Sequence, residues 1–257
     1  MMTADNDRLA RYYDLVHADA VADIPLLLGL AEETGGPILE LGAGSGRTLV
    51  PLARAGFTVV GLDNSEAMLA RARRRLAAAG LQERAALVLG EMTDFDLGRQ
   101  FPLVTAPFNT WMHLPNRQAQ SAALRCIARH LTPSGRLLIA LPAPATITSF
   151  EHDGALVLER TFDDPETGEL VLQFSSTQLD EMEQTLSITW IYDRIGADET
   201  VRRTLAPMKL RYLFRQEAEL LIEESGLSTT AVWGDNDRSP YTAGSEHLII
   251  LAEKPPP

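Results

Sequence analysis

The sequence predicts an α/β fold: a doubly wound, mostly parallel sheet that carries an inserted antiparallel sub-sheet. Two observations support this prediction. Between residues 36 and 142, short apolar runs alternate with helical stretches, which is the order of elements in a parallel sheet covered on both faces. From about 155 to 213 the helical period is absent, and four strand-like runs follow one another with turns between them.

Apolar periodicity and turn residues define the elements of the parallel part. Two helices are expected ahead of it, at 5–17 and 21–34. Its five strands are expected at 38–41, 58–62, 86–89, 103–108 and 136–141. Helices are expected between them at 48–55, from a cap at Asn64 or Ser65 to Gly80, and at 117–131. The fifth strand is almost wholly apolar, which indicates burial on both faces.

The inserted part is predicted as an antiparallel sub-sheet. Its strands are expected at 155–162, 169–177, 185–195 and 200–214. Polar and glycine-containing turns separate these runs, and apolar residues alternate with polar ones along the third, which suits a sheet with one covered face. A helix at 215–225 and strands near 229–233 and 247–252 complete a seven-stranded main sheet. We therefore expect one domain made of 1–145 and 213–257, and a lid or dimerisation subdomain at 146–212.

Composition excludes several kinds of protein. The chain has 257 residues, 45% of them hydrophobic, and a formal net charge of −12, which disfavours a phosphate backbone as partner. Its one cysteine, Cys126, allows no internal disulfide, and no cluster of His, Asp and Glu has the spacing of a metal site. The chain begins without the pattern of a signal peptide and has no apolar run of membrane-spanning length. We expect a cytoplasmic protein that binds no metal, no membrane and no nucleic acid.

A glycine-rich turn after the first strand is the most specific feature of the sequence. Glycines stand at every second position, Gly42, Gly44 and Gly46, directly after the strand that contains Glu40. Asp63 follows 21 residues after Gly42, at the end of the second predicted strand. Strand, tight turn, helix and second strand form the layout that binds the adenosine half of a nucleotide-like cofactor, with the acid placed to accept hydrogen bonds from ribose hydroxyls.

The spacing of the glycines narrows the kind of cofactor. A dinucleotide fingerprint reads G-x-G-x-x-G, whereas this chain has G-x-G-x-G with Arg47 where the last glycine would stand. The carboxylate of Glu40 would repel a pyrophosphate, but it suits a cationic ligand that carries an ammonium group. These observations disfavour a nucleotide-dependent oxidoreductase.

Together, these residues resemble the class I S-adenosylmethionine-dependent methyltransferases, which have a Rossmann-like fold. The resemblance covers about 36–142 and 215–253, and it implies that the last strand of the main sheet is antiparallel. It also implies that the segment from Glu40 to Gly46 wraps the methionine part of the cofactor and that Asp63 holds the ribose. The run 89–95 resembles the family segment that lines the adenine, which assigns the adenine to Glu91 and Met92. The expected cofactor residues are Glu40, Gly42, Ala43, Gly44, Gly46, Asp63, Asn64, Met68, Glu91, Met92 and Phe108.

The acceptor site is predicted from three segments. The run 108–114 resembles a family segment at the carboxyl ends of the strands and supplies Asn109, Trp111 and His113. His113 is the best candidate for a group near the methyl acceptor, because a neutral imidazole can accept a proton or orient an amine or a hydroxyl. The run Tyr12-Tyr13-Asp14 resembles the amino-terminal Tyr-Asp of the small-molecule branch, in which the tyrosine caps the cofactor and borders the acceptor. The expected catalytic residues are His113 and Tyr13, and the expected acceptor residues are Tyr12, Asn109, Trp111, Tyr192 and Arg211.

The leading interpretation is a methyltransferase that transfers a methyl group from S-adenosylmethionine to nitrogen or oxygen of a small molecule by direct displacement. The inserted sub-sheet resembles the branch of amino-sugar and glycine N-methyltransferase-like enzymes. A nucleotide-dependent oxidoreductase and a non-catalytic cofactor-binding module are the alternatives. Exposed strands of the insertion could pair across a two-fold axis, so a homodimer is plausible.

Overall fold

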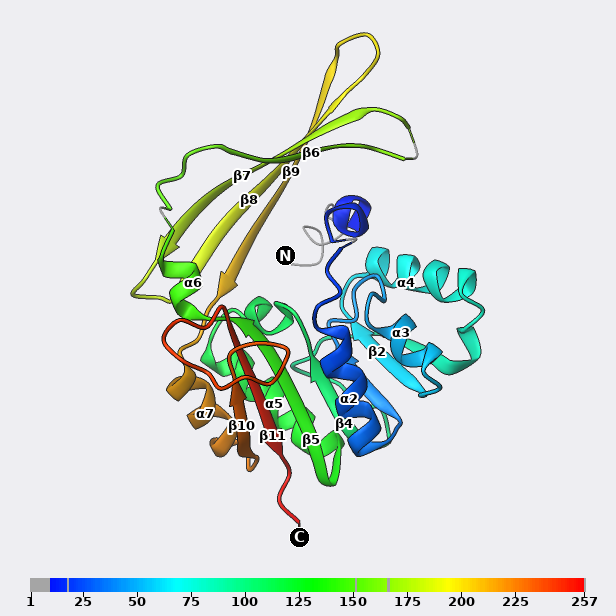
Figure 1. The fold of residues 1–257 in the computed structure, drawn as a ribbon, viewed down its shortest axis with the longest axis vertical. Helices are drawn as coiled ribbons and strands as arrows, with labels where there is room; N and C mark the ends of the chain where they lie inside the picture. The colour runs from blue at the N-terminus through cyan, green and yellow to red at the C-terminus, as the bar shows by residue number, and fades with distance from the viewer. Residues whose placement is uncertain (1–9, 18, 151, 166, 257) are drawn as a thin grey trace.

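The protein consists of two β-sheets, one above the other, with helices around the lower one (Figure 1). The structure is a computed structural model, and it describes residues 10–17, 19–150, 152–165 and 167–256. Both sheets were expected from the sequence, and the α/β fold class is confirmed.

The main sheet has seven strands in the order β10-β11-β5-β4-β1-β2-β3. They are β1 (Ile38–Leu41), β2 (Val59–Asp63), β3 (Ala85–Leu89), β4 (Phe101–Ala106), β5 (Leu131–Pro142), β10 (Ser228–Trp233) and β11 (His247–Glu253). Strands β1 to β5 pair in parallel, and β11 is antiparallel to both β5 and β10. The antiparallel strand expected near the carboxyl terminus is therefore confirmed. The strand order reverses between β1 and β4, which is where ligands bind in sheets of this kind.

Helices cover both faces of the main sheet. Helices α2 (Ile24–Thr34) and α3 (Leu49–Arg54) bury apolar residues against one face, whereas α5 (Arg117–His130) and α7 (Arg215–Glu224) do so against the other. Helix α4 (Glu66–Ala78) packs against β2 and β3, and Ser65 caps it by accepting a hydrogen bond from the Met68 backbone N–H. Two short 3₁₀ helices, η1 (Gln82–Arg84) and η2 (Thr110–His113), and α6 (Pro144–Thr148) complete this layer.

Strand β5 differs from the prediction. It begins at Leu131 rather than at residue 136, and the pairing with β4 shifts between Phe101 and Leu103. The residues between the helix expected at 117–131 and the strand expected at 136–141 lie within this irregularity, and Ser134 there has a positive φ of 57°. A local turn signal therefore did not end the strand, because residues on both sides of it still pair with β4. Helix α6 was not predicted.

The second sheet has four antiparallel strands in the order β6-β7-β8-β9. They are β6 (Val157–Asp163), β7 (Leu170–Asp180), β8 (Thr185–Ile195) and β9 (Val201–Arg211). Each lies within two to three residues of its predicted ends. The sheet stands over the carboxyl ends of the parallel strands (Figure 1).

The amino-terminal helix (residues 10–16) lies between the four-stranded sheet and α4 (Figure 1). The rest of the predicted helix, 5–9, falls outside the described residues. On the sheet side, the ring of Tyr12 stacks on Tyr192 with centroids 4.1 Å apart. On the other side, Asp14 pairs with Arg71 at 2.8 Å and Arg75 at 3.2 Å. The arginines of α4 are therefore not simply a solvated face, because two of them hold this helix.

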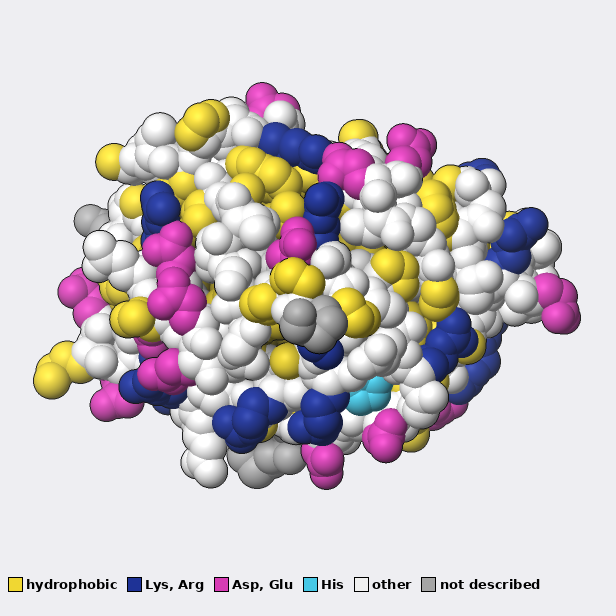
Figure 2. Space-filling model, turned by 90° about the horizontal axis from the view of Figure 1, so that it is seen from below, with side chains coloured by type: hydrophobic (Ala, Val, Ile, Leu, Met, Phe, Trp, Pro, Cys, Tyr) yellow, Lys and Arg dark blue, Asp and Glu magenta, His cyan; other side chains and the backbone are white. Residues whose placement is uncertain are grey.

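Charged side chains of both signs are interspersed on the face seen in Figure 2. The acidic net charge is thus accompanied by many basic neighbours on this side of the molecule. In the part of the chain that the structure describes, no helix is long and apolar enough to cross a membrane.

Candidate active site

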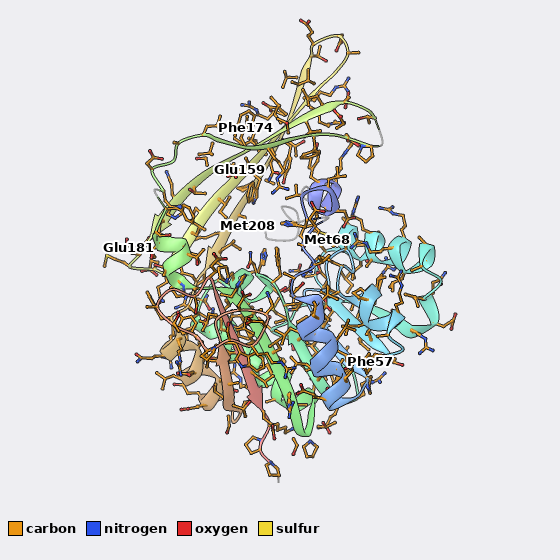
Figure 3. The ribbon with its side chains drawn as sticks, viewed as in Figure 1. Phe57, Met68, Glu159, Phe174, Glu181 and Met208 are labelled. Carbon is orange, nitrogen blue, oxygen red and sulfur yellow. The ribbon has the colours of Figure 1, made fainter. Side chains whose placement is uncertain are left out.

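A cavity of about 530 Å³ lies between the two sheets. Its volume falls within the range of roughly 300–1,000 Å³ that is typical of small-molecule sites. The main-sheet side contributes the loops after β1, β2, β3 and β4, and the other side contributes residues of β7, β8 and β9. Met68 of α4 and Met208 of β9 lie on opposite sides of this space (Figure 3).

The glycine turn after β1 forms part of the cavity wall. Gly42 and Gly44 line the cavity, and both have a positive φ, 64° and 54°. A Cβ atom on Gly42 would lie 2.4 Å from Cγ2 of Thr110, so only glycine fits against this neighbour. Gly46 faces away from the cavity, and a Cβ there would lie 3.2 Å from that of Ala72 in α4.

Asp63 connects the end of β2 to the glycine turn. Its Oδ2 accepts a hydrogen bond from the Gly44 N–H at 2.8 Å, and its Oδ1 accepts one from the Ser65 N–H at 2.9 Å. Burial raises the pKa of Asp63 above its ordinary value. The next residue, Asn64, donates a hydrogen bond to Glu91 at 3.2 Å, and Asp63, Asn64 and Glu91 all line the cavity.

Glu40 is a buried acid on the wall of the cavity. Its side chain is 2% exposed, and burial raises its pKa to about 8. Thr48 donates a hydrogen bond to Oε1, whereas no described residue bonds to the buried Oε2. A buried carboxylate with an unused oxygen is suited to a cationic or hydrogen-bond-donating ligand group.

A second group of side chains surrounds Phe108, which lines the cavity with a positive φ of 59°. The guanidinium of Arg47 lies 5.2 Å from the centre of the Phe108 ring and pairs with both carboxylate oxygens of Asp23 at 2.6 Å. His17 packs edge-on against Phe108, with ring centroids 5.2 Å apart. Burial lowers the pKa of His17 to about 4, so its ring is neutral at physiological pH.

His113 lines the cavity from η2. Burial lowers the pKa of His113, which keeps the imidazole neutral near pH 7. Tyr13 lines the cavity from the amino-terminal helix, and burial raises its pKa, so its hydroxyl is also uncharged. Two groups able to exchange hydrogen bonds with a ligand therefore meet at the cavity without carrying charge.

The four-stranded sheet covers the cavity with one face. We call its cavity-lining residues the sheet wall: Gln173, Ile188, Trp190, Tyr192, Met208 and Leu210. They come from β7, β8 and β9 and alternate along each strand with residues of the other face. Every member of the sheet wall is uncharged.

The structure brings together most of the residues predicted for the site. Those that line the cavity are Tyr13, Glu40, Gly42, Ala43, Gly44, Asp63, Asn64, Met68, Glu91, Met92, Phe108, Asn109, His113 and Tyr192. Four others lie elsewhere: Gly46, Tyr12, Trp111 and Arg211.

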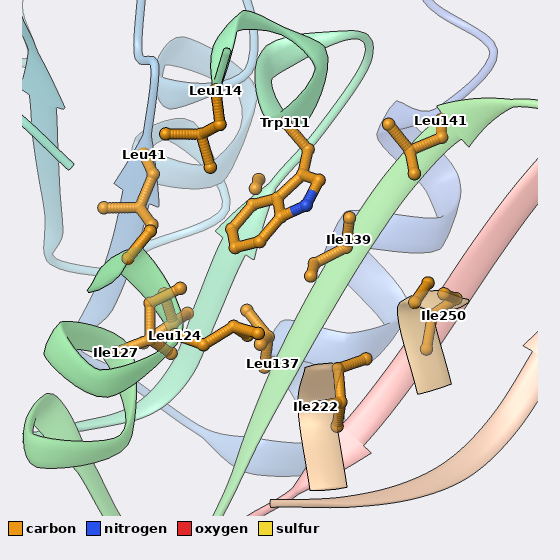
Figure 4. Packing of buried hydrophobic residues seen from close by; sticks show 14 of the residues in the cluster. Leu41, Trp111, Leu114, Leu124, Ile127, Leu137, Ile139, Leu141, Ile222 and Ile250 are labelled. Atoms are coloured by element: carbon orange, nitrogen blue, oxygen red, sulfur yellow. The ribbon is translucent and has the colours of Figure 1, made fainter. Parts of the chain in front are cut away.

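Trp111 is 1% exposed and packs in the core among Leu124, Ile139 and Ile222 (Figure 4). Arg211, at the end of β9, binds Gln120 at 2.9 Å and Glu217 at 2.7 Å, so it joins the sheet to helices α5 and α7. Tyr12 reaches the site indirectly, because the ring on which it stacks, Tyr192, belongs to the sheet wall. The described residues contain no group of His, Cys, Asp and Glu that could hold a metal ion.

Comparisons with known proteins decide the family. Residues 38–135 match a methyltransferase domain family. The structure is similar to that of the CcbJ methyltransferase from Streptomyces caelestis, with 27% sequence identity, a TM-score of 0.86 and 99% of each chain covered. Residues 38–135 are therefore a methyltransferase domain, and the chain as a whole has the class I S-adenosylmethionine-dependent methyltransferase fold with an additional antiparallel sheet. S-adenosylmethionine is its cofactor, and methyl transfer is its class of reaction.

Two curated relatives of this methyltransferase come from Streptomyces. One is the dTDP-3-amino-3,6-dideoxy-alpha-D-glucopyranose N,N-dimethyltransferase of Streptomyces fradiae, 36% identical over 51% of this chain and 52% of the relative. The other is the cypemycin N-terminal methyltransferase of a Streptomyces species, 28% identical over 86% of this chain and 84% of the relative. The chain thus matches only about half the length of the first relative.

The site of this methyltransferase contains residues that the sequence analysis did not assign to it. They are Val16, His17, Arg47, Thr48, Thr110, Gln173, Ile188 and Met208, among others. Val171, Gln173 and Ser175 are buried at alternate positions of β7, but in the sequence Leu170, Leu172 and Phe174 form the more apolar alternate set, so no local pattern indicates Gln173. Thr110 lies within the run 108–114 that was predicted at the acceptor site, whereas His17 reaches the cavity only in the folded chain.

Proposed function

We propose that this protein transfers the methyl group of S-adenosylmethionine to an amine nitrogen of a small molecule. The observation that carries the proposal is the cavity itself, with acids and a glycine turn on one side and an uncharged sheet wall on the other. The two curated relatives reported above are named for amine methylation, one on an amino sugar and one on a peptide amino terminus.

The cofactor fits the side of the cavity that the acids line. We assign its ammonium group to Glu40, whose buried Oε2 lacks a partner among the described residues. The carboxylate oxygens of Asp63 accept backbone hydrogen bonds, Oδ2 from Gly44 and Oδ1 from Ser65, and have further lone pairs for a ribose hydroxyl. Glu91 and Met92, at the next loop, are assigned to the adenine. Bound here, the cofactor supplies an electrophilic methyl group on a sulfonium.

The acceptor occupies the space between His113 and the sheet wall. Its nitrogen must present a free lone pair, which attacks the methyl carbon as the carbon–sulfur bond breaks and its electrons return to sulfur. The nitrogen then carries the positive charge until it releases a proton to water or to the neutral ring of His113. Positioning and exclusion of water can supply much of the rate enhancement of such a displacement.

The surroundings of His113 favour nitrogen over oxygen as the atom that accepts the methyl group. A general base for a hydroxyl acceptor is normally oriented by a third group. Among the described residues, none hydrogen-bonds to the His113 ring, and burial alone lowers its pKa. An amine needs only to be held in its neutral form, which the uncharged sheet wall over the acceptor favours.

The homodimer and the cytoplasmic location expected from the sequence remain predictions, as does the absence of nucleic acid among the partners. Exposed Leu156, Val157 and Leu158 near the edge strand β6 are compatible with contacts between two copies. Light scattering coupled to size-exclusion chromatography would measure the oligomeric state.

Calorimetry and mass spectrometry test the proposed function. S-adenosylmethionine and S-adenosylhomocysteine should bind in titration calorimetry, and nicotinamide dinucleotides should not. Purified protein is then incubated with S-adenosylmethionine and an amino sugar, a peptide with a free amino terminus, or a phenol. Methylation of an amine, detected by mass, supports the proposal, whereas exclusive methylation of the phenol would replace nitrogen by oxygen.

A further inference from the structure

Gln173 is a buried polar residue and the one member of the sheet wall that β7 contributes. It is 1% exposed, it lines the cavity, and it stands opposite Tyr192 in the β7–β8 register. No described residue donates a hydrogen bond to its buried Oε1. Leaving a buried acceptor unpaired costs about 1–3 kcal/mol, so such an atom in a cavity indicates a ligand group that completes it.

The neighbours of Gln173 do not replace that missing donor. The sheet wall around it is formed by aliphatic, thioether and aromatic side chains, with Trp190 and Tyr192 on the adjacent strand β8. Tyr12 stacks on the ring of Tyr192, with an interplanar angle of 9°. Gln173 therefore supplies the only amide of an otherwise apolar and aromatic surface, as far as the described residues of the sheet wall are concerned.

The sheet wall carries no charged side chain, whereas the acids of the site belong to the other side of the cavity. The acids Glu40, Asp63 and Glu91 come from the loops of the main sheet, where the cofactor is assigned. Arg47, a cation of the lining, is paired with Asp23 through two hydrogen bonds of 2.6 Å. The surface over the acceptor thus has apolar area for a ring and a single amide for a polar substituent.

We propose that Gln173 determines acceptor specificity by accepting a hydrogen bond from a hydroxyl group on the ring that carries the methylated amine. The inference rests on the proposed function, because it takes the sheet wall as the acceptor side. The ring packs on Trp190 and Tyr192, and its hydroxyl donates to Oε1 of Gln173. An acceptor without this hydroxyl leaves the oxygen buried and unpaired, and such a site discriminates more strongly than apolar contact alone.

Matched amines measure this effect without knowledge of the natural acceptor. The probes are cyclohexylamine and the 2-, 3- and 4-aminocyclohexanols, titrated into protein saturated with S-adenosylhomocysteine. Dissociation constants come from calorimetry or from tryptophan fluorescence, because Trp190 lines the cavity. At least one aminocyclohexanol should bind more tightly than cyclohexylamine to the unmodified protein, and Gln173→Met should reduce that preference by roughly 10- to 100-fold.

Two further variants test whether the binding preference depends on a side-chain oxygen at position 173. Gln173→Glu retains an oxygen at the same position and should retain the preference, whereas Gln178→Met, at an exposed position of the same strand, should leave it unchanged. For each variant we take the ratio of the dissociation constants of cyclohexylamine and an aminocyclohexanol. Differences in basicity among the amines affect this ratio equally in every variant, so they cancel when variants are compared. Circular dichroism and thermal unfolding confirm that each variant is folded.

The outcomes separate this inference from the proposed function. Equal binding of all four amines to the unmodified protein, binding of none, or an unchanged preference in Gln173→Met would overturn the role of Gln173. Methyl transfer to the same amines is measured in parallel by mass spectrometry. The unmodified protein could show the Gln173-dependent binding preference and yet transfer no methyl group to these amines. That result would overturn the proposed methylation of amines and leave the role of Gln173 in binding intact.

Discussion

Asp63 holds Gly44 in place: its Oδ2 accepts the Gly44 backbone N–H at 2.8 Å and so joins the end of β2 to the glycine turn after β1. The same carboxylate accepts the Ser65 N–H at 2.9 Å, at the cap of α4. A residue predicted only as a ribose ligand therefore also fixes the backbone that forms the cofactor wall. Its side chain thus connects the end of β2 and the cap of α4, which follow each other in sequence, to the glycine turn 19 residues earlier.

Removal of the Asp63 carboxylate should weaken cofactor binding and lower stability together. Asp63→Ala leaves the N–H groups of Gly44 and Ser65 without their acceptor and removes the proposed ribose contact. S-adenosylmethionine affinity, measured by calorimetry, should fall at least about tenfold, since hydrogen bonds to charged groups contribute roughly 1.5–3 kcal/mol each. Asp237→Ala serves as control, because Asp237 makes a similar bond to the Ser239 N–H in an exposed loop. Unchanged affinity in folded Asp63→Ala would place the ribose elsewhere.

Substitution of Gly42 should disrupt the site by a steric effect that a matched glycine lacks. Gly42 and Gly98 have nearly the same φ, 64° and 62°. A Cβ on Gly42 would lie 2.4 Å from Thr110, whereas one on Gly98 would meet nothing within 4 Å. Gly42→Ala should therefore abolish measurable S-adenosylmethionine binding and destabilise the protein more than Gly98→Ala, which adds only the strain of the left-handed backbone, about 1 kcal/mol. Similar losses of stability and affinity in both variants would show that Thr110 adjusts.

Ionisation of Glu40 should make the ligand-free protein less stable as the pH rises. Burial raises its pKa from the ordinary 4.5 to about 8 in the fold. Below about pH 4.5 both folded and unfolded chains hold the proton, so the group has no effect. Between about 4.5 and 8 the unfolded chain releases it first, so stability falls, and above about 8 the cost is constant.

Glu40→Gln tests this assignment, because the amide does not ionise and retains an oxygen for Thr48. Urea unfolding at several pH values should show the variant gaining on the unmodified protein from pH 5 to about pH 8, by up to a few kcal/mol in the free energy of unfolding. Affinity for S-adenosylmethionine should be lower in the variant. A difference in stability that does not change with pH would contradict the buried, protonated state of Glu40.

Replacement of His113 should reduce turnover and spare the cofactor. His113→Ala should retain S-adenosylmethionine affinity within about twofold, while kcat falls less than about 100-fold, the range of positioning rather than of general-base catalysis. Because burial lowers the pKa of His113 below its ordinary 6.5, its contribution to turnover should persist as the pH falls through 6.5. His247→Ala, on the partly exposed start of β11, is the matched control. A loss of 10²–10⁴-fold would assign His113 as the base, and loss of cofactor binding would remove it from the acceptor side.

Trp111 and His113 show that the sequence predicted the location of a segment but not which of its side chains face the cavity. Both residues belong to a run that was predicted to border the acceptor, and both lie in η2. His113 lines the cavity, whereas Trp111 is buried in the core (Figure 4). The local pattern placed the segment correctly at the carboxyl ends of the strands. It did not give the rotation of a short 3₁₀ helix, because packing against β5 and α7 sets that rotation.

Arg211 was expected at the cavity and lies elsewhere, whereas Gln173 was not expected there and lines it, and the reason is the same for both. A cation at the end of an inserted strand was expected in the pocket, but Glu217 of α7 lies 2.7 Å away and engages it. A glutamine in the second inserted strand attracted no expectation, yet it borders the cavity. Period-two alternation gives the two faces of a strand, but it does not tell what each face covers.

The sequence by itself determined the elements, their order and the grouping of Glu40, Gly42, Gly44 and Asp63, which all line the cavity. These follow from short-range chemistry: apolar periodicity, backbone freedom at glycine, and a fixed spacing along one strand–turn–helix–strand unit. Only the tertiary structure decided the acceptor side, including Gln173 and the neutral state of His113. Those properties depend on burial and on contacts between segments roughly 90 to 180 residues apart, such as Tyr12 with Tyr192 and the η2 loop with the four-stranded sheet. Both the burial and the contacts form only when the chain folds, so no local segment of the sequence specifies them.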